Sequence, residues 1–88
     1  MYVLVVNRTR PGLSPEELET LGRLARDFYG APPPGVRLLG DWAAVDGSAT
    51  YAILEVEGRE RLEALQEPFR PYVAMETIEV RPLSGWGG

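Results

Sequence analysis

Hydrophobic and polar residues follow two different periods along this chain, and the changes of period divide it into elements. Residues 2–9 are mostly β-branched and aromatic and stop before Pro11-Gly12, which predicts a first strand. Apolar residues then recur at helical spacing, which predicts an amphipathic helix that ends at Gly30. These apolar residues are Leu18, Leu21, Leu24, Ala25 and Phe28.

The start of this helix carries its own local signal. Ser14 is a good N-cap residue, Pro15 is favoured at the first helical position, and Glu17 lies three residues after the cap. Together they predict a capping box, in which each of the two side chains accepts a hydrogen bond from the other residue's backbone N–H. We therefore expect the helix to begin at Pro15.

The rest of the chain predicts a hairpin, a second helix and a last strand. Two apolar stretches, 36–45 and 49–57, flank Asp46-Gly47, a pair typical of a tight hairpin turn. The remaining elements are a short helix at 58–67 and a strand at 72–82, which ends at a proline.

A two-residue turn would set the register of this hairpin. The expected pairs are Val45 with Ser48, Trp42 with Tyr51, Gly40 with Ile53, and Leu38 with Glu55. Because side chains alternate across a strand, Trp42, Tyr51 and Glu55 would then share one face of the sheet.

The element order β-α-β-β-α-β is that of the split βαβ, or ferredoxin-like, plan. Right-handed crossovers would place both helices on one face of a four-stranded antiparallel sheet. We expect a single α+β domain over residues 1–82. A flexible, glycine-rich tail, 83–88, would follow, and its Trp86 either docks on this or a partner chain or stays disordered.

Both faces of the predicted sheet are apolar, yet two helices can cover only one of them. In the first strand Tyr2, Leu4 and Val6 point one way, while Val3 and Val5 point the other. A monomer would therefore expose a large apolar patch, which soluble proteins avoid. We predict a homodimer that pairs through the open sheet face.

Composition excludes several classes of site. The chain has 88 residues with no cysteine or histidine, and all nine of its basic residues are arginine. A disulfide framework, a thiolate zinc site, a cysteine or histidine nucleophile–base pair and a lysine Schiff base are therefore ruled out. The net charge of −4 argues against nucleic acid as a partner.

We also expect no membrane association and a cytoplasmic location. No apolar run approaches the ~20 residues of a membrane span, and no secretory leader is recognisable. The scarcity of asparagine and glutamine, with arginine in place of lysine, is typical of some thermophile proteins.

Proton transfer in such a chain would fall to tyrosine or to a carboxylate with a raised pKa. Most acids lie on solvated helix faces, which leaves Glu55 and Glu76, both on otherwise apolar strand faces, as catalytic candidates. The alternative for either is an ion pair with an arginine or a position at a wet strand end. Available arginines are Arg8, Arg37 and Arg81.

Four residues are candidates for binding a small molecule: Trp42, Tyr51, Glu55 and Asn7. Trp42 would stack on a ring or simply pack in the core, and Asn7 would anchor a polar group or bond a strand end. Gly40 leaves room on the Trp42 face for either a bulge or a cavity. No acidic spacing resembles a calcium loop and no glycine-rich phosphate loop is present, so we expect no metal and no cofactor.

Several short motifs stand out along the second half of the chain. They run from Pro34-Gly35-Val36 to Asp41-Trp42, continue at Gly47 and Glu55, and end with Glu76-Thr77-Ile78-Glu79-Val80-Arg81-Pro82. With these motifs the chain resembles a small bacterial family of unknown function within the dimeric α+β barrel superfamily. The resemblance implies a ferredoxin-like subunit that pairs through its sheet, and it implies no reaction. The superfamily includes cofactor-free monooxygenases, isomerases, haem-degrading proteins and ligand sensors, and the missing histidine counts against haem.

Three functions remain open at this point. The first is a homodimeric small-molecule-binding protein with no assigned catalysis. The second is a cofactor-independent monooxygenase or isomerase acting on an aromatic or enolic compound, with Glu55 or Glu76 as proton acceptor. The third is a structural or subunit-interaction module whose apolar face meets a different partner.

Overall fold

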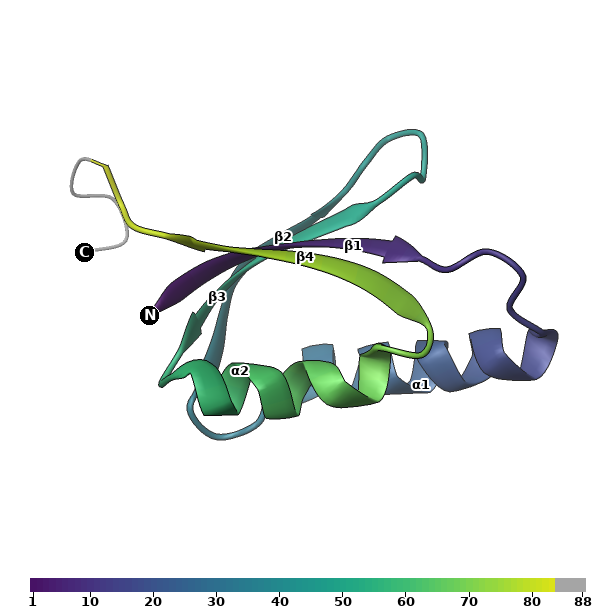
Figure 1. Ribbon diagram of the computed structural model, residues 1–88, viewed down its shortest axis with the longest axis horizontal. Coiled ribbons are helices and arrows are strands. Elements are labelled where there is room, and N and C mark those ends of the chain that lie inside the picture. The colour runs from purple at the N-terminus through teal and green to yellow at the C-terminus, as the bar shows by residue number, and fades with distance from the viewer. Residues whose placement is uncertain (84–88) are drawn as a thin grey trace.

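The computed structural model describes residues 1–83, which form two layers, a curved sheet and a pair of helices (Figure 1). The elements follow in the order β-α-β-β-α-β, so the predicted ferredoxin-like α+β fold is confirmed. They are β1 (Tyr2–Thr9), α1 (Pro15–Gly30), β2 (Val36–Ala43), β3 (Thr50–Val56), α2 (Arg59–Gln66), the short 3-10 helix η1 (Glu67–Phe69) and β4 (Val73–Val80). Of the predicted tail, 83–88, only Leu83 is described, and Trp86 lies outside the described residues.

The strands form one antiparallel sheet in the order β2-β3-β1-β4. Both helices lie against the same face of the sheet, and the β2–β3 hairpin extends away from them on the other side (Figure 1). In the part of the chain that the structure describes, the second face of the sheet therefore has no helix over it. No helix within residues 1–83 is long and apolar enough to cross a membrane.

The core lies between the sheet and α2. Val3 and Val56 are fully buried, and Leu62 of α2 packs against the sheet with only 3% of its surface exposed. In contrast, α1 has no buried residue along its length, although Phe28 packs against the edge of the core. The two helices thus cover the sheet unequally, and space remains under α1.

The start of α1 is the one predicted. The Glu17 backbone N–H donates to Ser14 Oγ at 3.1 Å, and the Ser14 backbone N–H donates to Glu17 Oε1 at 2.9 Å. Pro15 occupies the first helical position, where its missing N–H would have no partner in any case. Two of the free donors of the first turn are thereby satisfied.

The hairpin register is partly the one predicted. Trp42 lies opposite Tyr51 and Gly40 opposite Ile53, but the prediction that Leu38 lies opposite Glu55 is wrong. A bulge at Leu39 shifts the register, so that Leu38 pairs with Leu54. The extra residue lets Leu38 pack on the helix side while Trp42 keeps its place on the open face, which a regular strand would not allow.

The turn itself is longer than two residues. The Ala44 backbone N–H donates to the Ala49 carbonyl, and residues 45–48 form the loop, with Gly47 at φ +77°. Inside this loop Asp46 Oδ1 accepts the Ser48 backbone N–H at 2.9 Å. Hydrogen bonding from Ser48 lowers the pKa of the Asp46 carboxyl below its ordinary value.

Both sheet faces carry apolar side chains, as the strand patterns predicted. Ala52, Leu54 and Val56 of β3 are buried on the helix side, and Tyr51 and Ile53 lie on the open side. Among the open-face residues of the edge strands, Trp42 is 59% exposed and Ile78 is 43% exposed. A patch of large apolar side chains therefore faces outward from the single chain.

Candidate functional site

A cavity of about 360 Å³ lies between the sheet and α1, with α2 and η1 at its side. Small side chains leave this room, among them Ala25 on α1 and Ala49 and Ala52 on the sheet side. The volume falls in the range of small-molecule sites, which begins at about 300 Å³.

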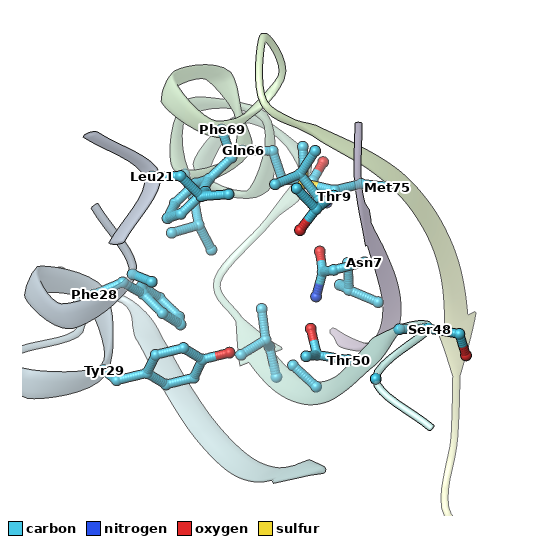
Figure 2. Close-up of a pocket in the computed structure, with 18 residues that line it drawn as sticks. Asn7, Thr9, Leu21, Phe28, Tyr29, Ser48, Thr50, Gln66, Phe69 and Met75 are labelled. Atoms are coloured by element: carbon cyan, nitrogen blue, oxygen red, sulfur yellow. The ribbon is translucent and has the colours of Figure 1, made fainter. Parts of the chain in front are cut away.

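The inner part of the cavity is apolar. Val5 and Leu54 form its floor on the sheet, and Leu65 closes it from α2. Phe28 on α1 and Phe69 on η1 present aromatic rings to the same space (Figure 2). An apolar body of modest size would be removed from water on all these sides, which is favourable at about 25 cal/mol per Å² buried.

Polar groups gather along one wall, contributed by the strands. Figure 2 shows Thr9, Asn7 and Thr50 in a row along this wall, with Phe28 and Tyr29 of α1 on the opposite side. The register explains the row, because Asn7 lies directly opposite Thr50, and Thr9 follows two residues later on the same face of β1.

Thr9, Thr50 and Tyr29 are exposed, whereas Asn7 is partly buried and Val5 is buried. The polar wall therefore lies toward the open end of the cavity, and the apolar part lies deeper. No hydrogen bond of the Asn7 amide to another protein group is seen within residues 1–83. Its donor and acceptor are thus available to a bound molecule.

The Tyr29 hydroxyl projects from α1 toward Thr50 (Figure 2). Burial raises the pKa of Tyr29 above its ordinary value of 10.0, and the negative charge of Asp41 raises it further. Asp41 lies on β2 opposite Ala52, hence on the helix side of the sheet. At neutral pH Tyr29 is therefore a neutral hydroxyl that can donate or accept a hydrogen bond.

Gln66 lies at the end of α2 and is 7% exposed, the buried polar residue of the described chain. Its amide nitrogen donates to the Thr77 hydroxyl on β4 at 2.8 Å. This bond ties α2 to the edge strand and holds the side chain that forms part of the cavity wall. Satisfying the amide in this way avoids the cost of an unpaired buried donor.

The four predicted binding residues fall on two sides of the sheet. Asn7 lines the cavity, whereas Trp42, Tyr51 and Glu55 lie together on the open face, as the hairpin register predicted. Within one chain the sheet therefore separates Asn7 from the other three. Binding by any of the four stays a prediction.

The two catalytic candidates also lie on the open face. Glu55 forms an ion pair with Arg37, its neighbour across the strands, and both border a second, wider hollow of about 460 Å³ next to Met1. Glu76 lies opposite Val6 on β4 and is exposed. Neither carboxylate lines the cavity under α1.

Trp42 occupies the room that Gly40 provides. A Cβ atom at Gly40 would lie only 2.6 Å from the Trp42 ring, so the indole folds over the glycine backbone. The open space expected beside Gly40 is thus filled by the chain's own side chain, and the bulge lies next to it at Leu39. Part of the tryptophan ring nevertheless remains exposed.

Metal ligation finds no support among residues 1–83, where no group of three or more acidic, histidine or cysteine side chains gathers. Of the described polar residues that line the cavity, the sequence identified Asn7 as a binding candidate; it did not point to Thr9, Tyr29, Ser48, Thr50 and Gln66, nor to the aromatic Phe69. For Gln66 a signal existed: it is the only glutamine, and it lies four residues after the inward-facing Leu62. Tyr29 and Phe69 carry no comparable local signal.

The fold and the cavity define an α+β protein of the ferredoxin-like type with a ligand-sized space between sheet and helices. Residues 2–84 match the model of the family DUF3303, a domain of unknown function, and the chain belongs to that family. This agrees with the expected resemblance to a family of unknown function and extends it across nearly the whole chain. A comparison with curated proteins finds no match.

Proposed function

We propose that this chain is a homodimeric small-molecule-binding protein of the dimeric α+β barrel type that holds its ligand under α1. The cavity carries the proposal: it has the size of a ligand site, an apolar interior and a row of neutral polar groups around Asn7. That combination is typical of small-molecule sites, where few polar groups orient an otherwise apolar contact. We assign no catalysis to it.

The alternative of a cofactor-independent monooxygenase or isomerase has less support. A proton acceptor would have to lie within hydrogen-bond reach of the ligand. In the described part of the chain no carboxylate lines the cavity, Glu55 is paired with Arg37, and Glu76 lies on the open face.

The homodimer is proposed from the uncovered sheet face. Leu4, Ile53 and Ile78 lie in neighbouring strands on this face, and Trp42 adds a half-exposed indole at its edge. A second copy packed face to face would remove this apolar surface from water, as in isologous interfaces.

Charge on the open face favours such self-association. The face carries Arg8 and Arg37 together with Glu55 and Glu76, so its charges balance although the whole chain has a net charge of −4. Two copies can therefore approach without net repulsion between these faces.

Native mass spectrometry of the purified chain tests the dimer. A species of twice the chain mass supports it, and a monomer contradicts it and favours the interaction-module alternative.

Binding in the cavity is tested by titration calorimetry with 2-naphthol, a neutral bicyclic probe. Ala25 lines the cavity from α1, whereas Ala64 lies on the exposed side of α2. We expect Ala25→Phe to weaken 2-naphthol binding by at least about tenfold, because the added ring occupies the space of the probe. Ala64→Phe, the matched control, should leave the affinity unchanged.

Two outcomes would contradict the proposal. If the wild-type chain does not bind 2-naphthol, the cavity does not accept a ligand of this size and chemistry. If the chain binds the probe but Ala25→Phe and Ala64→Phe behave alike, the probe binds elsewhere. Circular dichroism of both variants confirms that the comparison is made between folded proteins.

A further inference from the structure

We propose, resting on the binding function above, that the cavity selects an uncharged ligand with an apolar body and one hydrogen-bonding group, which the Asn7 amide recognises. The ligand class follows from what the cavity wall contains and from where its polar groups lie.

None of the side chains of residues 1–83 that line the cavity carries a charge. The polar residues of the cavity wall are Asn7, Thr9, Tyr29, Ser48, Thr50 and Gln66. Removing a charged group from water without a partner of opposite sign is strongly unfavourable. A charged ligand group inside this cavity would have no such partner, whereas a hydroxyl, carbonyl or amide needs only a hydrogen bond.

Charged residues border the cavity without lining it. Asp46 directly precedes the lining residues Gly47 and Ser48 in the hairpin loop, and Asp41 lies close enough to Tyr29 to raise the pKa of its hydroxyl. Arg10 and Arg70 directly follow the lining residues Thr9 and Phe69 and are joined by a hydrogen bond, so positive charges border the cavity as well, and the rim favours neither sign of charge. Neither aspartate lines the cavity, so neither provides a carboxylate to pair with a cation inside it.

Asn7 is placed to recognise the polar end of the ligand. Its amide is partly buried, faces the cavity between Thr9 and Thr50, and makes no hydrogen bond to the rest of residues 1–83 (Figure 2). Since an amide both donates and accepts, it fits an alcohol or a carbonyl equally. An apolar body extending inward from that point would meet Val5 and Leu54.

Four naphthalene probes of similar shape measure separately how the apolar body, the hydrogen-bonding group and the charge of a ligand affect its affinity. 2-Methylnaphthalene is apolar, 2-naphthol is a neutral hydrogen-bonding isostere, 2-naphthoate is an anion, and 2-naphthylmethylamine is a cation at neutral pH. We expect 2-naphthol to bind about two- to tenfold more tightly than 2-methylnaphthalene, which is the effect of one net hydrogen bond. Both ions should bind at least about tenfold more weakly than 2-naphthol.

Asn7→Leu, which is close in size, tests the recognising residue. We expect this variant to bind 2-naphthol and 2-methylnaphthalene with equal affinity, and to bind 2-methylnaphthalene at least as tightly as the wild type does. Glu60→Gln on the exposed side of α2 is the control, because Glu60 does not line the cavity, and it should leave all four affinities unchanged. If Asn7→Leu does not fold, Thr50→Val removes a neighbouring hydroxyl from the same wall and should reduce the preference for 2-naphthol.

The outcomes separate this inference from the function on which it rests. If either ion binds as tightly as 2-naphthol, selection for uncharged ligands is wrong while the binding function stands. If 2-naphthol keeps its advantage in Asn7→Leu, Asn7 does not recognise the polar group. If no probe binds the wild-type chain, the proposed function itself fails, and this inference fails with it.

Discussion

Tyr29 lies at the open end of the cavity, where burial and a neighbouring negative charge both act on its hydroxyl. Burial is the larger cause and Asp41 the smaller, and each raises the pKa of Tyr29 above 10.0. The unfolded chain therefore releases this proton at a lower pH than the folded chain does. The stability associated with Tyr29 is fully present below about pH 10 and is lost as pH rises through the folded-state pKa.

We predict that Tyr29→Phe loses less stability than the wild type between about pH 9 and about pH 11, which lie on either side of the ordinary tyrosine pKa. Urea unfolding midpoints of both proteins at the two pH values measure the difference. The other tyrosines are common to both proteins and cancel in the comparison. An equal loss in the two proteins would contradict the shifted pKa.

Asn7 shows how far a single residue of the site could be predicted. Its residue type and its place near the end of an apolar strand identified it as a polar anchor. Grouping it with Trp42 and Tyr51 required knowing which face of β3 adjoins which face of β1, and that depends on the pairing of Val6 with Tyr51. The two strands lie far apart in sequence, so no local turn reports this register.

At the scale of elements, local signals were reliable at the start of α1 but not at the hairpin turn, where Asp46-Gly47 predicted a two-residue turn and the loop comprises residues 45–48. Ser14, Pro15 and Glu17 determine the start of α1 through contacts within four residues. The bulge at Leu39 was missed because it depends on contacts with distant parts of the chain. It allows Leu38 to be buried beneath the helices while Trp42 lies on the open face. The cavity was missed because it depends on how far α1 lies from the sheet.

The capping box at the start of α1 predicts a measurable contribution to stability. Ser14→Ala removes the acceptor for the Glu17 N–H and should lower the free energy of unfolding by about 1 kcal/mol. Ser14→Asn keeps an acceptor at the cap and should stay within a few tenths of a kcal/mol of the wild type. Urea denaturation of the three proteins tests this, and equal midpoints for Ser14→Ala and the wild type would show that the cap contributes nothing.

At the scale of the whole molecule, the two faces of the sheet carry different features. The helix side holds the core and the cavity, and the open side presents apolar groups with balanced charges. If the open faces of two chains meet, Trp42, Tyr51 and Glu55 become interface residues, and the cavities under the two α1 helices stay on the outer sides of the pair. Ligand binding and dimerisation would then use opposite faces of one sheet.

Ile78→Arg tests dimerisation without disturbing the fold of the single chain. Ile78 on the open face and Leu18 on α1 are exposed to similar extents, 43% and 49%, so either position can hold an arginine in a folded monomer. In a face-to-face dimer only the arginine at position 78 would be removed from water, and burying a charge is costly. We expect light scattering to give twice the chain mass for the wild type and Leu18→Arg, and the chain mass for Ile78→Arg.

Unfolding provides a second measurement of the same dimer. Because association stabilises only the folded state, the unfolding midpoint of the wild type should rise with protein concentration, while that of Ile78→Arg should not. An Ile78→Arg dimer of unchanged stability would mean that the chains associate through another surface.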